Sequence, residues 1–180
     1  MTFVAKKSLG QNFLNDNKVI KIIADLGKID RDDFILEVGA GTGNLTEIIL
    51  EQSPKKLFVI EKDSRLALYL NEKFGDKINI FNEDMMKFEY EKYYKNKLII
   101  FGNLPYNIST QILAKWIRVK NLDSFCKKFI LMFQKEVADR IIAETNTKNY
   151  GRLSILSNWK MKIDKIIDIE PESFKPVPKV

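Results

Sequence analysis

Short apolar runs alternate with amphipathic segments along most of the chain. Five of these runs predict buried strands, at residues 34–38, 57–60, 77–81, 98–101 and 129–133. Between them, apolar residues recur at helical spacing and predict helices at residues 17–27, 109–119 and 135–144, and after Asn44 and Asp63. Strands that alternate with helices through short connections indicate an α/β fold, with a mostly parallel sheet and helices on both faces.

Two further apolar stretches, residues 153–159 and 162–169, are close enough in sequence to pair as an antiparallel hairpin. With this hairpin at one edge, we expect a seven-stranded sheet. Parallel α/β sheets bind ligands beyond the carboxyl ends of their strands, where the strand order reverses. Functional residues are therefore expected in the loops that follow the predicted strands.

The composition excludes several kinds of chemistry. The chain has 180 residues, with one cysteine and no histidine. Without histidine, Ser-His-Asp and Cys-His nucleophile systems and His-ligated catalytic zinc are excluded, and we expect no metal. The single Cys126 cannot form an intrachain disulfide, which fits a reducing compartment and predicts a cytoplasmic protein. No stretch approaches the roughly 20 apolar residues that span a bilayer, so no membrane partner is expected.

The charge points to a class of partner without identifying it. A hydrophobic content of 45% is sufficient for one domain with a core. The 30 Lys and Arg residues exceed the 24 Asp and Glu residues, which gives a net charge of +6. Basic side chains neutralise phosphates and release counterions, so a polyanionic partner is suggested. Many basic proteins bind no nucleic acid, and the charge alone does not separate the two classes.

Three glycines, Gly39, Gly41 and Gly43, stand between a predicted strand and a predicted helix. Missing side chains let the backbone approach a ligand, and the free N–H groups of a helix N-terminus point toward it. The spacing G-x-G-x-G differs from the G-x-G-x-x-G of dinucleotide sites and lacks the G-K-[ST] of a P-loop. Taken alone, the glycines fit either a ligand-binding loop or a tight turn between strand and helix.

Acidic residues follow the next two predicted strands. Glu61 lies about 20 residues beyond the glycines, where a carboxylate can accept hydrogen bonds from ribose hydroxyls. Its alternative role is a surface carboxylate beside Lys62. Asp84 can accept from an adenine amino group, with Met85 against the ring, or can cap a turn. Together with the glycines, these acids describe a site for a nucleoside-containing ligand.

The loop after the fourth predicted strand reads Gly-Asn-Leu-Pro-Tyr-Asn over residues 102–107. Pro105 stiffens this turn and places Tyr106 close to Asn103. The side-chain carbonyl of Asn103 and the backbone carbonyl of Leu104 can accept hydrogen bonds from the exocyclic amine of a nucleobase, on which Tyr106 can stack. The loop alone also fits a proline turn whose tyrosine simply packs.

These segments resemble the motifs of amino methyltransferases. Asn103-Leu-Pro-Tyr106 resembles their [NDS]-P-P-[YF] motif, and Glu37-Val-Gly-Ala-Gly-Thr-Gly43 resembles their S-adenosylmethionine loop. Over nearly the whole chain, five ordered motifs resemble the small-subunit rRNA adenine N6,N6-dimethyltransferase family: Leu9-Gly-Gln-Asn-Phe-Leu14, Asn103-Leu-Pro-Tyr-Asn-Ile-Ser-Thr110, Gln134-Lys-Glu-Val-Ala138, Tyr150-Gly-Arg-Leu-Ser154 and Phe174-Lys-Pro-Val-Pro-Lys-Val180. The resemblance implies a Rossmann-like class I S-adenosylmethionine-dependent methyltransferase fold.

The resemblance also implies roles for individual residues, with S-adenosylmethionine as methyl donor. Residues implied to bind this cofactor are Gln11, Asn12 and Leu14 above its methionine part, Gly39, Gly41 and Gly43 beneath it, Glu61 at the ribose, Asp84 at the adenine, and Asn103. Residues implied to hold the target adenine are Asn103 and Leu104 at its N6 amine, and Tyr106 and Phe174, whose rings sandwich the base.

The resemblance implies methylation of two adjacent adenines in a loop near the 3′ end of small-subunit rRNA, late in assembly of the small ribosomal subunit. Residues 1–180 are expected to form a monomeric catalytic domain, and the smaller helical domain that follows in relatives is absent from this sequence. Basic residues are expected to form an RNA-facing rim: Lys6, Lys7, Lys115, Arg118, Lys120, Lys127, Lys128, Lys148, Arg152, Lys175 and Lys179.

Two alternatives remain at this stage. The large-subunit adenine methyltransferases of the macrolide-resistance type share the Q-N-F and N-[LI]-P-Y signatures, although Leu9-Gly10 and Asn107-Ile-Ser-Thr110 favour the small-subunit family. The other alternative is a non-catalytic RNA-binding assembly factor with the same fold. The intact loop from Asn103 to Tyr106 argues against it.

Overall fold

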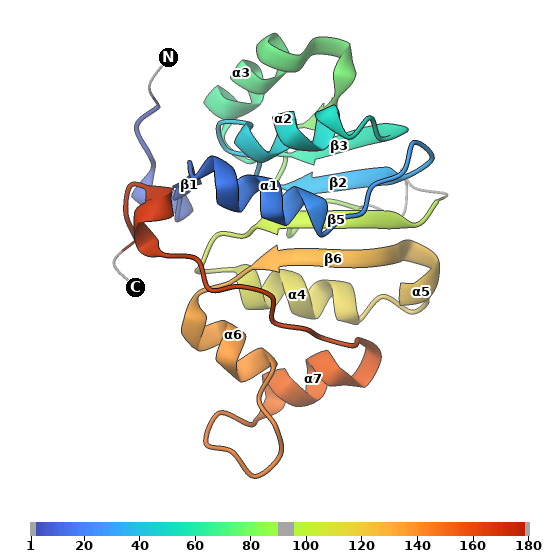
Figure 1. Cartoon of the computed structure of the whole chain (residues 1–180), viewed down its shortest axis with the longest axis vertical. Coiled ribbons are helices and arrows are strands. Elements are labelled where there is room, and N and C mark those ends of the chain that lie inside the picture. The colour runs from blue at the N-terminus through green and yellow to red at the C-terminus, as the bar shows by residue number, and fades with distance from the viewer. Residues whose placement is uncertain (1–2, 90–95, 179–180) are drawn as a thin grey trace.

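The computed structural model describes residues 3–89 and 96–178. Its centre is a sheet of five parallel strands in the order β4 (Asn79–Phe81), β3 (Lys56–Ile60), β2 (Phe34–Val38), β5 (Leu98–Asn103) and β6 (Cys126–Met132) (Figure 1). The chain enters this sheet at β2, continues outward to β4, and then returns to the other side of β2 with β5. The strand order therefore reverses between β2 and β5, where Val38 lies beside Gly102.

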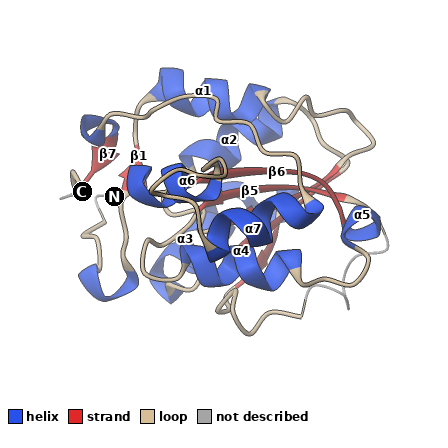
Figure 2. Cartoon of the chain, turned by 90° about the horizontal axis from the view of Figure 1, so that it is seen from below, coloured by secondary structure: helices blue, strands red, loops and turns tan. Residues whose placement is uncertain are grey.

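Helices cover both faces of the sheet (Figures 1 and 2). One face carries α1 (Asn17–Asp25), α2 (Asn44–Glu51) and α3 (Ser64–Phe74), and the other carries α4 (Ser109–Ile117). Side chains alternate between the two faces: Ile99 and Phe101 of β5 join one core, and Leu98 and Ile100 join the other. Burial on both faces explains the uninterrupted apolar runs at residues 57–60 of β3 and 98–101 of β5.

The remaining elements lie around this sheet. α5 (Leu122–Phe125) leads directly into β6, and α6 (Lys135–Ile141) and α7 (Arg152–Lys160) pack on α4 through a third apolar cluster. β1 (Phe13–Leu14) and β7 (Phe174–Lys175) form a separate antiparallel pair beyond the carboxyl ends of the central strands (Figure 1). Short 3-10 turns occur at Lys7–Leu9, Gly75–Lys77 and Pro171–Ser173. None of the helices in the described residues is long and apolar enough to cross a bilayer.

The predicted α/β class and the five central strands are confirmed. The count of seven strands is not, because the described residues place five strands in the central sheet and two in the separate pair. The predicted antiparallel edge hairpin is wrong. Residues 153–159 belong to α7, and residues 162–169 form no strand.

Residues 153–159 form a helix because their buried positions follow helical spacing. Leu153 and Leu156 pack against α4 and α6, and Ser154 and Ser157 are buried between them. The Ser154 hydroxyl donates a hydrogen bond to the backbone carbonyl of Arg140 at 2.7 Å. A strand would place Leu153 and Ser154 on opposite faces, whereas the helix buries Ser154 and packs the partly buried Leu153 against the same cluster.

Gly43 provides a test of the packing between α2 and α3. Its backbone is left-handed, with φ 79°, and a Cβ there would lie 2.7 Å from side-chain atoms of Leu70 and Phe74. We expect Gly43→Ala to lower the free energy of unfolding by about 2–4 kcal/mol, because crowding adds to backbone strain. Denaturant unfolding followed by circular dichroism measures the change.

Gly10→Ala is the matched control for this substitution. Gly10 shares the left-handed backbone, with φ 63°, but a Cβ there would make only ordinary contacts at 3.4 Å or more. We expect a loss of about 1 kcal/mol from backbone strain alone. Equal losses in the two variants would contradict the role given to crowding at Gly43.

Candidate active site

A cleft opens where the strand order reverses, at the carboxyl ends of the central strands. It is lined by residues 8–14, the glycine turn after β2, residues 60–62 after β3, residues 83–86 after β4, and residues 103–108 after β5. These are the loops that the topology of a parallel sheet predicts for ligand binding. The N-terminal segment, residues 4–14 before α1, lies over these loops, and its residues 8–14 form one wall of the cleft.

The glycine turn is closely packed against both neighbouring walls of the cleft. Gly39 has φ 74°, and a Cβ there would lie 3.1 Å from the backbone oxygen of Asn103. Gly41 has φ 59°, and a Cβ there would lie 2.9 Å from the ring of Phe13. A side chain at either position would therefore enter the cleft or displace a wall.

Glu61 is fixed at the end of β3, beside the glycine turn. It is buried, and its two carboxylate oxygens accept hydrogen bonds from the backbone N–H groups of Gly41 at 3.0 Å and Asp63 at 2.9 Å. Burial raises the pKa of Glu61 above its usual value. The alternative of a surface carboxylate paired with Lys62 is wrong, because Lys62 pairs with Asp84 instead.

Asp84 combines the two roles that its sequence position allowed. It lines the cleft, and it also closes a turn by accepting from the backbone N–H of Met86 at 2.9 Å. Its other oxygen accepts from Lys62 Nζ at 2.8 Å, which lowers the pKa of Asp84. Met85 is buried and lines the cleft next to it. An ionised carboxylate therefore faces the cleft after β4.

Lys115 of α4 holds this loop from below. Its Nζ donates hydrogen bonds to three backbone carbonyls, those of Met85 and Met86 at 3.1 Å and that of Phe88 at 2.8 Å. These contacts tie the loop after β4 to the helix that follows β5. Lys115 is consequently a structural residue, which corrects its predicted place in an RNA-facing rim.

The loop after β5 brings Asn103, Leu104 and Tyr106 to the cleft. Asn103 Nδ2 donates to the backbone carbonyl of Asn12 at 3.0 Å, and no described residue donates a hydrogen bond to its Oδ1. Leu104 is buried, and Tyr106 is half-buried, which raises the pKa of its hydroxyl. The backbone N–H of Ile108 closes the turn on the carbonyl of Pro105 at 3.1 Å. The amide of Asn103 is thus oriented by the N-terminal segment.

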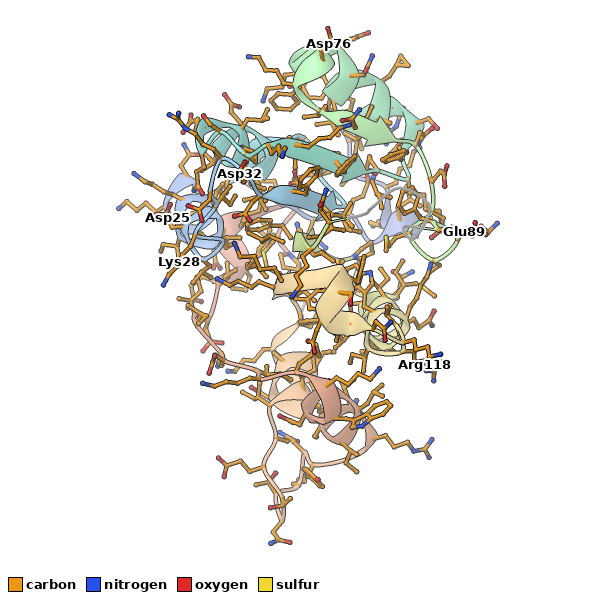
Figure 3. All side chains as sticks on the ribbon, turned by 90° about the vertical axis from the view of Figure 1, so that its right-hand side faces the viewer. Asp25, Lys28, Asp32, Asp76, Glu89 and Arg118 are labelled. Carbon is orange, nitrogen blue, oxygen red and sulfur yellow. The ribbon has the colours of Figure 1, made fainter. Side chains whose placement is uncertain are left out.

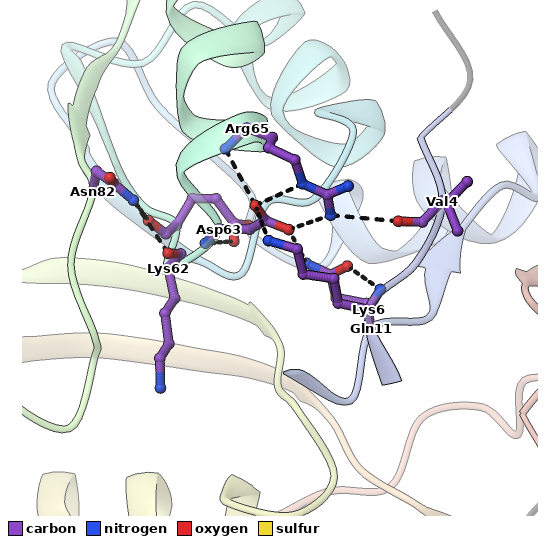
Figure 4. Close-up of polar contacts among 8 residues, drawn as sticks. Val4, Lys6, Gln11, Lys62, Asp63, Arg65 and Asn82 are labelled. Carbon is purple, nitrogen blue, oxygen red and sulfur yellow. Dashed lines mark hydrogen bonds and ion pairs between the residues drawn. The ribbon is translucent and has the colours of Figure 1, made fainter. Parts of the chain in front are cut away.

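The N-terminal segment also carries Gln11 and Leu14 to the cleft, as the sequence predicts. Gln11 uses its amide to contact the protein: Nε2 donates to Asp63 at 3.0 Å, and Oε1 accepts from the backbone N–H of Lys6 at 2.7 Å (Figure 4). The carbonyl of Leu14 accepts from Asn44 Nδ2 at 2.8 Å. The contacts made by Asp63 and Asn44 were not predicted, since nothing in sequence spacing links α2 or α3 to the N-terminus.

Two predicted site residues, Gly43 and Phe174, are not among the residues that line the cleft. Gly43 packs against Leu70 and Phe74 of α3 instead. The Phe174 ring is buried in the core under α1, and Phe174 pairs with Leu14 between β7 and β1. The sandwich of a target base between Tyr106 and Phe174 stays a prediction, and in this arrangement the Phe174 ring fills core volume.

Several basic residues of the predicted rim lie away from the cleft. Lys127 pairs with Asp33 at 2.9 Å, and Lys128 donates to the carbonyl of Leu26 at 3.0 Å, both from the first half of β6. α4 begins at the cleft and runs away from it. Arg118 and Lys120, which follow α4, therefore lie toward the end of the sheet that carries Lys127 and Lys128, and Figure 3 shows Arg118 there. The rim members that stay exposed in other regions are Lys6, Lys7, Lys148, Arg152 and Lys175, and of these Lys6 pairs with Asp63. Lys179 lies outside the described residues.

Glu37 lines the cleft from within β2 and was not singled out as a site residue. It is 2% exposed, and Thr46 Oγ1 donates to its carboxylate at 2.6 Å. Burial raises the pKa of Glu37 to about 7, and the nearby charge of Glu61 acts in the same direction. A glutamate inside an otherwise apolar strand was the signal available in the sequence. Within the described residues, no group of three or more acidic or cysteine side chains is arranged to bind a metal ion.

The raised pKa of Glu37 predicts a pH dependence of stability. Between about pH 4.5 and pH 7 the folded protein keeps a proton that the unfolded chain has released, so the free energy of unfolding falls as pH rises through this window. We expect Glu37→Gln to remove on the order of 3 kcal/mol of this fall. Urea unfolding between pH 4 and pH 8 measures it. The exposed Glu47→Gln is the control, and a Glu37→Gln profile parallel to the wild type would refute the assignment.

Comparison with known proteins identifies the family. Residues 2–180 match the family model described as ribosomal RNA adenine dimethylase. The chain is 54% identical to ribosomal RNA small subunit methyltransferase A of Pelagibacter ubique, over 98% of this chain and 67% of that protein. It is 45% identical to the protein of the same name from Wolbachia pipientis, over 97% of this chain and 66% of that protein. The chain thus spans about two thirds of the length of these relatives.

Solved structures give the same result for the fold. A dimethyladenosine transferase from Plasmodium falciparum has a TM-score of 0.83 at 32% identity, over 93% of this chain and 59% of that one. The 23S rRNA methyltransferase ErmE has a TM-score of 0.76 at 28% identity, over 94% of this chain and 66% of that one. Because the family model matches nearly the whole of this chain, the chain belongs to the ribosomal RNA adenine dimethylase family.

Proposed function

We propose that this chain binds S-adenosylmethionine and carries the catalytic site of an rRNA adenine N6,N6-dimethyltransferase of the small-subunit type. Its substrate is a pair of adjacent adenines near the 3′ end of small-subunit rRNA, in the assembling subunit and in the cytoplasm. The names of its relatives support this class of substrate. The observation that carries the proposal is the oriented amide of Asn103 at the switch point of the sheet.

The shape and donors of the cleft fit S-adenosylmethionine. Gly39 and Gly41 leave the glycine turn free of side chains, and each oxygen of Glu61 accepts one hydrogen bond, which leaves lone pairs for ribose hydroxyls. Asp84 accepts from the adenine amino group, with Met85 beside the ring. Asn12 and Leu14 cover the methionine part. When bound, this cofactor supplies a methyl group activated by a positively charged sulfonium.

Asn103 and Leu104 position the amine that receives the methyl group. Because Nδ2 of Asn103 is held by the carbonyl of Asn12, its Oδ1 is the atom left to accept from the target N6. The Leu104 carbonyl accepts the second hydrogen, so the nitrogen lone pair is directed at the methyl group. Orientation of this kind supplies a large part of the acceleration when the electrophile is already activated. Tyr106 stacks on one face of the base.

Replacement of Asn103 tests this mechanism. We expect Asn103→Ala to lower methyl transfer at least about 100-fold, since an orienting acceptor is lost, while the affinity for S-adenosylhomocysteine stays within about threefold. Transfer is measured with radiolabelled S-adenosylmethionine and unmethylated small-subunit particles. Mass spectrometry of the rRNA then locates the methyl groups. Asn121→Ala, an exposed asparagine before α5, is the matched control.

The outcomes separate the alternatives. Methyl groups on large-subunit instead of small-subunit rRNA would support a function of the macrolide-resistance type. A wild-type chain that binds particles but transfers no methyl group would support a non-catalytic assembly factor. Unchanged transfer by Asn103→Ala would contradict the mechanism.

We also propose that RNA contacts the loop between α6 and α7, through Lys148 and Arg152. Both are exposed, and α6 starts three residues after β6 ends at the cleft. We expect Lys148→Gln/Arg152→Gln to weaken binding to small-subunit particles about tenfold and to reduce its salt dependence, because two phosphate contacts are lost. Lys97→Gln, at an exposed lysine immediately before β5, should change neither. If the double variant and Lys97→Gln had equal effects in filter-binding assays, the RNA would not contact Lys148 and Arg152.

A further inference from the structure

Asp63 collects more hydrogen bonds than its position at the start of α3 requires. Its side chain has no solvent exposure, and its carboxylate accepts from Lys6 Nζ at 3.1 Å, Gln11 Nε2 at 3.0 Å and Arg65 Nη2 at 2.7 Å (Figure 4). Capping of the helix uses only the additional bond from the backbone N–H of Arg65 at 3.2 Å. Arg65 Nε also donates to this carboxylate at 3.1 Å, so two of its four side-chain donors belong to Arg65 and the other two, from Lys6 and Gln11, belong to the N-terminal segment.

This carboxylate is ionised and fully engaged. Its donors hold the pKa of Asp63 far below the usual range, with Arg65 the largest cause. If one of these donors moved away, the buried carboxylate would lose part of its compensation, which is unfavourable. The cluster therefore favours the arrangement in which all donors contact Asp63. Arg65 reaches further along the segment by donating from Nη2 to the carbonyl of Val4 at 3.4 Å. Residues 4–11 are therefore held on the start of α3.

The cluster is linked to the proposed catalytic loop through two adjacent residues. Gln11 contacts Asp63, and the next residue, Asn12, accepts the hydrogen bond from Asn103 Nδ2. A shift of Gln11 therefore moves the carbonyl that orients the Asn103 amide. Among the described residues, no hydrogen bond joins the start of α3 directly to the end of β5, and the N-terminal segment connects them through hydrogen bonds to both.

We propose that Asp63 is a positioning residue for methyl transfer, which acts by holding Gln11 and thereby the Asn12 carbonyl that orients Asn103. This inference rests on the proposed function of the cleft. Asp63 touches neither cofactor nor target, and its effect is transmitted through the N-terminal segment. When the segment is held in place, it orients the Asn103 amide and keeps Asn12 and Leu14 over the methionine part of S-adenosylmethionine.

Asp63→Asn separates this role from helix capping. Asparagine caps helices as well as aspartate does, so the α3 N-terminus stays capped. Its amide nitrogen, however, faces the Gln11 and Arg65 donors where an acceptor is needed. We expect kcat to fall about tenfold and the affinity for S-adenosylhomocysteine to fall about tenfold. Hydrogen exchange of the backbone amides of residues 6–14 should speed up by a similar factor.

Two further variants complete the experiment. Asp33→Asn removes another ion-paired, largely buried aspartate at the opposite end of the sheet, and should keep both constants within about twofold of wild type. Gln11→Glu/Asp63→Asn exchanges the carboxylate and the amide across the same hydrogen bond. Because the introduced glutamate accepts from the introduced asparagine while still accepting from the Lys6 N–H, we expect this double variant to recover at least threefold of the lost kcat and to restore protection of the segment.

The results decide the proposal. It is overturned by an Asp63→Asn chain that matches Asp33→Asn in kcat, affinity and exchange, or by a segment whose exchange is unchanged while activity falls. A wild-type chain that binds S-adenosylhomocysteine but methylates no rRNA would contradict the proposed function instead. The affinity and exchange comparisons then still test whether Asp63 orders the segment.

Discussion

The cleft depends on hydrogen bonds between the N-terminal segment and three loops that are otherwise separate. Asn44 at the start of α2, Asp63 at the start of α3 and Asn103 at the end of β5 each bond to this segment, at Leu14, Gln11 and Asn12 respectively. A parallel sheet ends in loops with unpaired backbone groups, and each loop alone has several accessible conformations. Because the N-terminal segment bonds to all three loops, it restricts their conformations together. The geometry of the cleft therefore depends on this segment being in place.

Electrostatics within the cleft favour a positively charged ligand. Glu37, Glu61 and Asp84 all line it; Lys62 neutralises Asp84, whereas the nearby charge of Glu61 contributes to the raised pKa of Glu37. A cation placed near Glu37 and Glu61 stabilises their ionised forms and relieves that repulsion. S-adenosylmethionine carries a positively charged sulfonium, and its product S-adenosylhomocysteine does not. The same carboxylates therefore provide a physical reason for the donor to bind in preference to the product, within the proposed function.

Sequence reasoning recovered features that are set by local pattern. The central strands are apolar because both faces are buried, and the glycine turn needs residues that tolerate positive φ and close walls. It failed where tertiary packing decides. Residues 153–159 are apolar enough for a strand, but Ser154 and Ser157 fit the surface of α4 and α6 only as a helix. Phe174 shares its family motif but lies in the core, since its position depends on the pairing of β7 with β1.

Net charge is the feature whose meaning the structure changes most. A net charge of +6 suggests a continuous basic surface, yet several of the 30 basic side chains pair with or donate to groups inside the fold. Lys6 neutralises Asp63, Lys127 pairs with Asp33, and Lys115 and Lys160 donate to backbone carbonyls at helix and loop ends. Such cations are less available to release counterions from phosphates, because their partners must first be exchanged. The attraction for RNA therefore depends on the local field of a few exposed residues near the cleft, and total charge is a poor measure of it.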